Sequence, residues 1–67
     1  MEQVTTILDV HNLLKRFGIW IYTGDRLGDL ELMAEELQEL FDLGLIEKET
    51  YLSGIMAINQ EKRKWKK

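Results

Sequence analysis

The chain contains no cysteine and no proline, and it has a single histidine among its 67 residues. The absence of cysteine excludes a disulfide framework and a thiolate metal site, and one histidine provides no cluster of imidazole ligands. No apolar run approaches the roughly 20 residues of a membrane span, and the N-terminus lacks the basic-then-apolar pattern of a secretory signal. We therefore expect one cytoplasmic domain, residues 1–67, built from helices that proline does not interrupt.

The net charge of −3 conceals a separation of charge along the chain. Residues 1–24 are balanced, residues 25–49 carry a net charge of −7, and residues 50–67 carry +4. All five bases of the last segment lie in a basic tail, residues 62–67. Binding partners must therefore be considered surface by surface, because the net charge describes neither surface.

Apolar residues recur at helical spacing in three segments, which predict helices over residues 7–17, 26–43 and about 47–63. The connections are short, so we expect an all-α fold, a compact three-helix bundle whose successive helices lie nearly antiparallel. The last, lysine-rich turn is expected to fray. Gly54 interrupts the third helix at a cost of about 1 kcal/mol relative to alanine. That cost reflects either the close approach of another helix or simple tolerance.

Polar residues mark the starts of the first two helices. Thr6 and Asp9 have the spacing of a capping box, and Asp25 is placed to cap the second helix through its carboxylate. Arg26 is expected to form a salt bridge with a nearby acid, namely Asp29, Glu47 or Glu49.

The connector, residues 18–25, does not follow the helical pattern. Between two glycines, aliphatic and aromatic side chains alternate with a period of two, which is typical of extended backbone. Trp20 and Tyr22 should therefore lie on one side and the two isoleucines on the other. The rings either form a stacking platform or lie as amphipathic lids over the end of the bundle.

Five segments in a fixed order resemble the YqgQ-like family, small cytosolic proteins of Gram-positive bacteria that carry a domain of unknown function. They are residues 8–15, 18–22, 24–26, 32–41 and 45–49. Their order is D-V-x-x-L-L-K, aromatic connector, G-D-R, acidic helix and L-I-x-x-E, and the resemblance covers about residues 8–62. It implies a three-helix fold, no known enzymatic activity, and a single-stranded nucleic-acid-binding role suggested by fold comparison. The chain departs from the family at His11, where we expect a glutamine-like residue, and in its more basic tail.

One functional hypothesis is that the protein binds single-stranded RNA or DNA. Aromatic rings would stack on bases and cations would neutralise phosphates, without a sequence code. The basic patch would extend from the tail to the first helix if the first and third helices lie side by side. The alternative is a solubilising tail whose tryptophan covers the edge of the core. The candidate residues are Lys15, Arg16, Trp20, Tyr22, Lys62, Arg63, Lys64, Trp65, Lys66 and Lys67.

A second hypothesis is a protein-interaction module. The acidic face of the second helix would meet a basic partner, or a small apolar patch around Leu32 and Trp20 would dock a protein. Leu32 falls outside the apolar stripe and is either buried by a second neighbouring helix or exposed. So small a core also makes self-association an open alternative. The candidate residues are Leu32, Glu31, Glu35 and Glu39.

No enzyme, cofactor, metal or membrane partner is expected. The sequence lacks a serine–histidine–acid set, a phosphate-binding glycine loop and a dinucleotide fingerprint. A chain of this length scarcely encloses the cleft that paired carboxylates need for acid–base chemistry. We expect His11 at the surface or at the boundary of the core, because no other ligand converges on it.

Overall fold

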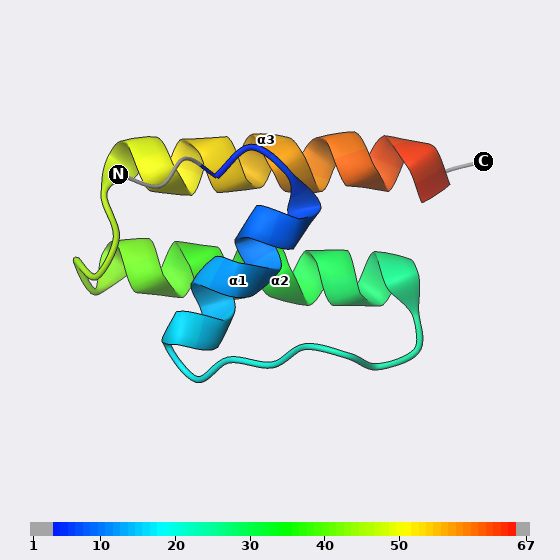
Figure 1. Ribbon diagram of the computed structural model, residues 1–67, viewed down its shortest axis with the longest axis horizontal. Helices are drawn as coiled ribbons and strands as arrows, with labels where there is room; N and C mark the ends of the chain where they lie inside the picture. The colour runs from blue at the N-terminus through cyan, green and yellow to red at the C-terminus, as the bar shows by residue number, and fades with distance from the viewer. Residues whose placement is uncertain (1–3, 66–67) are drawn as a thin grey trace.

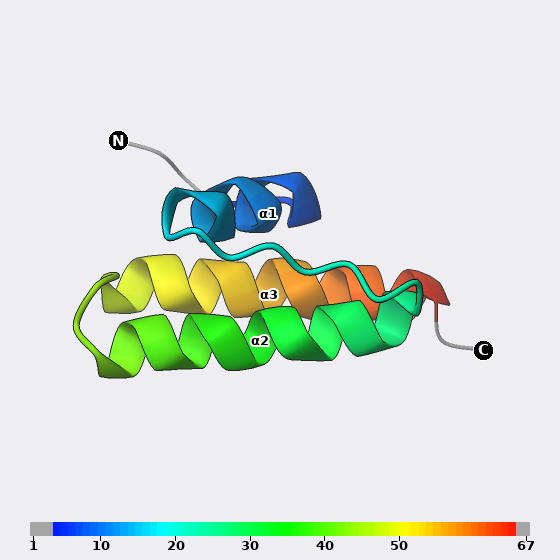
Figure 2. The same cartoon turned by 90° about the horizontal axis from the view of Figure 1, so that it is seen from below.

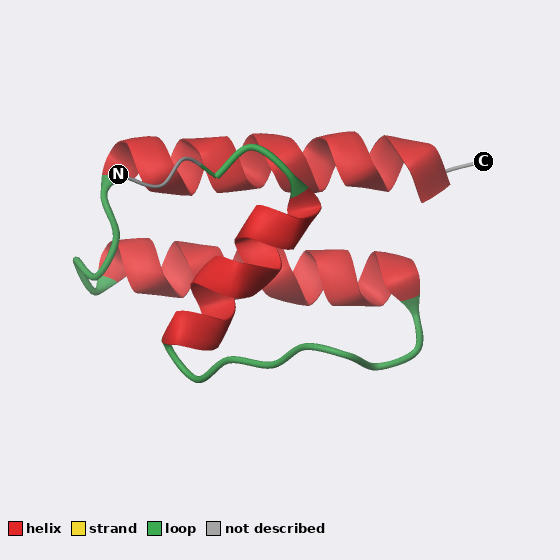
Figure 3. Ribbon diagram, viewed as in Figure 1, coloured by secondary structure: helices red, strands yellow, loops and turns green. Residues whose placement is uncertain are grey.

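In the computed structural model, which describes residues 4–65, two long helices form an antiparallel hairpin and a short helix crosses one face of it (Figures 1 and 2). The helices are α1 (Ile7–Arg16), α2 (Arg26–Asp42) and α3 (Lys48–Trp65). Residues 4–65 contain no strand (Figure 3). The all-α, three-helix fold expected from the sequence is therefore confirmed.

The direction of α1 differs from the prediction that successive helices lie nearly antiparallel. α2 and α3 do so, whereas α1 starts over α3 and ends beyond the outer edge of α2 (Figure 1). Residues 17–25 explain the difference, because they run back along α2 before that helix begins (Figure 2). An extended segment of that length spans about 30 Å, enough to follow α2 from one end to the other.

The predicted capping box at the start of α1 is confirmed. The Thr6 hydroxyl accepts a hydrogen bond from the Asp9 N–H at 3.3 Å, and the Asp9 carboxylate accepts one from the Thr6 N–H at 3.2 Å. The same carboxylate accepts two bonds from Thr5, at 3.0 and 3.1 Å. The backbone bond from Thr5 is the main cause of the lowered pKa of Asp9.

A glycine ends α1 and turns the chain into the connector. Gly18 has a φ of +74°, a conformation that other residues rarely adopt, and the Ile19 N–H donates to the Leu14 carbonyl at 2.9 Å. The helix itself ends at Arg16, one residue before the predicted boundary.

Gly54 sets the separation of α2 and α3. A Cβ placed on Gly54 would lie 2.7 Å from Cδ1 of Leu37, so the glycine reflects close helix approach. Further along the hairpin the rings of Phe41 and Tyr51 stack with centroids 4.9 Å apart, and the Tyr51 hydroxyl donates to Gln38 Oε1 at 2.5 Å. The hairpin is therefore held by apolar packing and a polar contact at its edge.

The core lies between the hairpin and the layer formed by α1. Its largest fully buried side chains come from all three helices: Val10, Leu14, Leu30, Met33, Leu37 and Ile58. Ile19 and Ile21 of the connector pack against this core and close its edge. Among residues 4–65, no helix is long and apolar enough to cross a membrane.

The end of α3 is more regular than predicted. The helix continues through Trp65, whereas the sequence predicted a helix to about residue 63 and a frayed, lysine-rich last turn. Glu61 stabilises this last turn, because its carboxylate accepts a bond from Trp65 Nε1 at 3.1 Å and lies 3.6 Å from Lys64 Nζ.

Candidate nucleic-acid interface

The connector presents two aromatic rings to solvent. Ile19 and Ile21 are half-buried, whereas Trp20 is 75% exposed and Tyr22 is 89% exposed. The predicted placement of the two rings on one side of the connector and the two isoleucines on the other is confirmed. The interpretation of both rings as lids over the bundle is wrong, because the two isoleucines close the edge of the core instead.

A lysine from the last turn of α1 lies over one of these rings. Lys15 Nζ is 4.8 Å from the centroid of the Trp20 ring, within the range of a cation–π contact. Trp20 and Tyr22 are two residues apart, which places them about 6.6 Å from each other along extended backbone. This distance is about twice the 3.4 Å rise between stacked bases. We call Lys15, Trp20 and Tyr22 the connector platform.

A buried carboxylate fixes the far end of the connector to α2. Asp29 is 5% exposed, and its Oδ1 accepts hydrogen bonds from the Thr23 N–H at 2.8 Å and from the Thr23 hydroxyl at 2.5 Å. Such donors allow a carboxylate to remain buried. The sequence does not reveal this pair, because a six-residue spacing belongs to neither helical nor strand periodicity. The sequence does place Asp29 one helical turn before the apolar residue Met33, on the same side of α2, and this position indicates that the Asp29 carboxylate is buried.

The predicted carboxylate cap at the start of α2 is not formed. Asp25 occupies the N-cap position, but its side chain makes no capping hydrogen bond. Its carboxylate lies over Gly28 instead, and a Cβ on that glycine would be 2.9 Å from Asp25 Oδ2. The Thr23 hydroxyl accepts a bond from the Asp25 N–H at 3.3 Å, so the turn is fixed from the connector side.

Trp65, at the end of α3, has different surroundings. The Glu61 carboxylate accepts from Trp65 Nε1 and, at 3.0 Å, from Nη2 of Arg26, while the Arg26 guanidinium lies 5.8 Å from the centroid of the Trp65 ring. The hydrogen bond from Trp65, followed by that from Arg26, lowers the pKa of Glu61. A carboxylate thus sits at the centre of this cluster, which disfavours a phosphate there. The pairing of Arg26 with Glu61 corrects the sequence prediction, which named Asp29, Glu47 or Glu49 as its partner.

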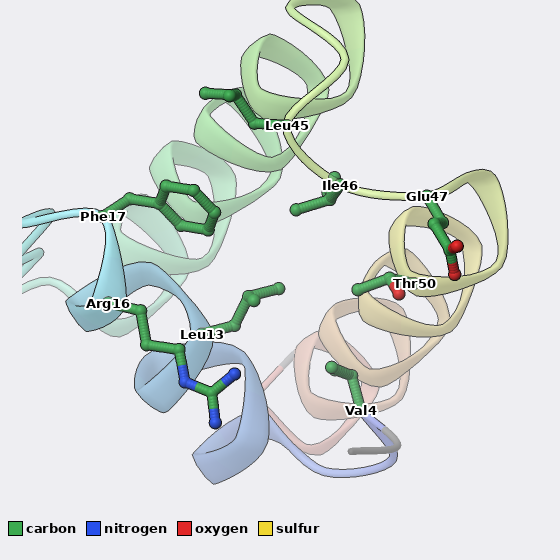
Figure 4. A pocket seen from close by; sticks show the side chains of 8 residues that line it. All are labelled: Val4, Leu13, Arg16, Phe17, Leu45, Ile46, Glu47 and Thr50. Carbon is green, nitrogen blue, oxygen red and sulfur yellow. The ribbon is translucent and has the colours of Figure 1, made fainter. Parts of the chain in front are cut away.

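The structure does not unite the two groups of cations. Arg16 lines a pocket whose opposite wall includes Glu47 and Thr50 of the α3 end (Figure 4), because α1 crosses the hairpin toward the α2–α3 loop (Figure 1). Tail residues 62–65, the part of the tail that the structure describes, lie roughly 20 Å further along α3, at 1.5 Å per residue. The continuous basic patch, which required the first and third helices to lie side by side, is therefore not formed by Arg16 and the described tail residues. Within the tail, Arg63 and Lys64 are exposed and Lys62 is half-buried, and Lys66 and Lys67 lie outside the described residues.

The residues proposed for a protein partner lie on one side of α2. Glu31, Glu35 and Glu39 are all exposed at intervals of four residues. Leu32 lies beside them and is 40% exposed, which answers the question left open by the sequence. We call these four residues the acidic outer face of α2.

An open pocket separates the end of α1 from the start of α3 (Figure 4). Its volume is about 280 Å³, slightly below the usual range for small-molecule sites. Arg16 and Glu47 contribute charge to its wall, and the apolar lining consists of Val4, Leu13, Phe17, Leu45 and Ile46. In residues 4–65 no three histidine, aspartate or glutamate side chains are grouped so as to hold a metal ion.

His11 lies at the boundary of the core, half-buried on α1. Its pKa is lowered, first by burial and then by the positive charges of Arg26 and Lys15, against the opposing effect of Asp29.

Comparison with known proteins identifies the family. The sequence profile of the YqgQ-like family matches residues 4–64, which include all of α1 and α2 and nearly all of α3. The chain belongs to the YqgQ-like family. It is also similar to the Bacillus subtilis (strain 168) protein named "Uncharacterized protein YqgQ", at 40% identity over 58 residues, 87% of this chain and 82% of that protein. The resemblance noted from the sequence is confirmed, and membership of this family does not by itself assign a function.

Proposed function

We propose that this YqgQ-like protein is a cytoplasmic, non-catalytic binder of single-stranded nucleic acid, and that the connector platform is its binding surface. The observation that carries the proposal is the exposure of two aromatic rings on the same side of the connector, with Lys15 over one of them. Each ring offers a π-face to a base, and the ammonium group offers a positive charge to a phosphate.

The exposure of these two rings is unexpected in a protein with so small a core, because burying them would add apolar contacts to that core. Aromatic side chains have large apolar surfaces whose burial stabilises a fold, and a chain of this length has little stabilisation to spare. In the connector, isoleucines fill the inward positions while the larger rings remain outside. Exposed aromatic residues on a fixed segment are typical of binding surfaces.

The expected affinity is modest. Stacking contributes roughly 1–3 kcal/mol per base, so two rings and one or two phosphate contacts support a dissociation constant between about 10 μM and 1 mM. Each phosphate contact gives a slope of about −0.7 in a plot of log affinity against log salt concentration. Raising the salt from 50 to 200 mM should then weaken binding about threefold for one contact and about sevenfold for two. If all five tail cations contacted phosphates instead, the same increase in salt would weaken binding more than about a hundredfold.

Fluorescence anisotropy of labelled oligothymidylate and oligouridylate tests the proposal. Trp20→Ala and Tyr22→Ala should each weaken binding by about fivefold or more, and Lys15→Gln should reduce the salt slope by about 0.7. Trp65→Ala is the matched control, since it removes an aromatic side chain outside the platform. The proposal fails if neither oligonucleotide binds at 50 mM salt, or if Trp65→Ala abolishes binding that Trp20→Ala leaves unchanged.

A protein partner at the acidic outer face of α2 is the second candidate function. The observation that favours it is the exposure of Leu32 among three glutamates, which suits a basic partner with an apolar contact. Affinity capture from cell extract, with and without nuclease, distinguishes the two functions. Partners that persist after nuclease treatment and are lost with Leu32→Asp support a protein interaction, whereas partners that vanish with nuclease contradict it.

A further inference from the structure

The face of the hairpin opposite α1 is uncovered. Both α1 and the connector lie on the other side of α2 and α3, and no part of residues 4–65 covers this face (Figure 2). At 100° per residue, apolar side chains of both helices lie where the seam of the hairpin meets this uncovered side, and three of them, Ala34, Tyr51 and Ile55, also pack against the core. We call this surface the rear face, and its residues are Leu27, Ala34 and Phe41 on α2 and Tyr51, Leu52 and Ile55 on α3.

The rear face has the pattern of a helix-packing surface. Leu27, Ala34 and Phe41 are spaced seven residues apart, like one position of a coiled-coil heptad. Leu27 is 39% exposed and Leu52 is 47% exposed, while the other four residues are half-buried. Apolar surface thus remains in solvent along both helices of the hairpin.

Charges of opposite sign border the two edges of this face. By helical periodicity Glu31 and Asp42 lie beyond Leu27 around α2. On α3, Arg63 lies just beyond Leu52 and Lys48 lies between Leu52 and Ile55, and all four charged residues are exposed. A surface with one acidic and one basic edge is complementary to a copy of itself, which is what a two-fold interface requires.

We propose that the rear face pairs with the rear face of a second copy of this chain, with the two-fold axis parallel to the helices. Each α2 then packs on α3 of the other copy, so that the two hairpins together form a four-helix arrangement of two layers. In each hairpin the start of α2 adjoins the end of α3, as the Arg26–Glu61 pair shows. Glu31 therefore meets Arg63 of the second copy, and Asp42 meets its Lys48.

The charges also exclude the other two-fold arrangement. An axis across the helices would place α2 on α2 and α3 on α3, so that acidic edges face each other and basic edges face each other. Like charges in close contact oppose association, so the edges select the parallel axis. The connector platform remains outside the interface, because it lies on the α1 side of the hairpin (Figure 2).

Sedimentation equilibrium of the full chain between 1 μM and 1 mM tests the pairing. The mass should rise from the 7.9 kDa of one chain toward twice that value as concentration increases. Leu52→Lys should raise the dissociation constant of the dimer about tenfold or more. Leu8→Lys, a change at a residue that is 62% exposed on α1, is the matched control and should leave the dissociation constant unchanged. Circular dichroism confirms that each variant is folded.

A charge exchange tests the proposed orientation. Glu31→Arg and Arg63→Glu should each weaken the dimer, and the double variant should recover the wild-type dissociation constant within about threefold, because every copy then carries the exchanged pair. A mass of 7.9 kDa up to 1 mM overturns the proposal. A dimer that Leu52→Lys leaves intact, or a double variant weaker than both single variants, also overturns it.

Discussion

Replacing Gly54 with alanine tests whether glycine sets the separation of α2 and α3. Two effects of the substitution oppose each other. Alanine is favoured over glycine inside a helix by about 1 kcal/mol. The added Cβ, however, would lie 2.7 Å from Cδ1 of Leu37, which is fully buried and has no open space to enter. Overpacking of this kind costs about 1–3 kcal/mol, so the net effect is a loss of up to about 2 kcal/mol.

Urea denaturation followed by circular dichroism measures this loss against a total stability of about 3–10 kcal/mol for a chain of this length. Gly28→Ala is the matched control, because its Cβ meets only the carboxylate of exposed Asp25, which can move into solvent. That variant should be as stable as the wild type or more stable. In a Leu37→Ala background the cost of Gly54→Ala should disappear, since the clashing methyl group is absent. The reasoning is refuted if Gly54→Ala raises the stability of the wild-type chain by about 1 kcal/mol.

Three further predictions concern polar side chains. Because the pKa of His11 is lowered in the folded chain, the unfolded chain binds more protons, and the free energy of unfolding should fall as pH drops below about 6.5. Urea denaturation at several pH values measures this slope, and His11→Gln should remove it. The lowered pKa of Glu61 contributes stability above about pH 4.5 that is lost at lower pH, and Glu61→Gln should reduce the acid dependence of the melting temperature. Thr23→Val should cost about 1–3 kcal/mol, because it removes a donor from buried Asp29, whereas Thr5→Val, at an exposed position, should cost less by the same assay.

The local features of the fold could be predicted from the sequence. The capping box of Thr6 and Asp9 depends on a three-residue spacing, and the position of Trp20 and Tyr22 on the same side of the connector depends on a period of two. Both patterns involve only neighbouring residues. The helix boundaries and the all-α class follow from the same kind of short-range information.

The features that the sequence could not give depend on contacts between distant segments. Arg26 pairs with Glu61, 35 residues away, only because α2 and α3 form a hairpin. The separation of Lys15 from the basic tail depends on the direction in which α1 crosses that hairpin, and no periodicity encodes this direction. The choice between exposed and buried rings likewise depended on whether the isoleucines of the connector suffice to close the core.

Nuclear magnetic resonance of the ¹⁵N-labelled chain, titrated with oligothymidylate, tests the connector platform most directly. The chain has two tryptophans, and their indole N–H signals report on two separate surfaces. The proposed function predicts that the indole signal of Trp20 and the amide signals of residues 15–23 shift with added oligonucleotide, while the indole signal of Trp65 stays in place. Shifts confined to Trp65 and α3, or no shift anywhere at low salt, would contradict it.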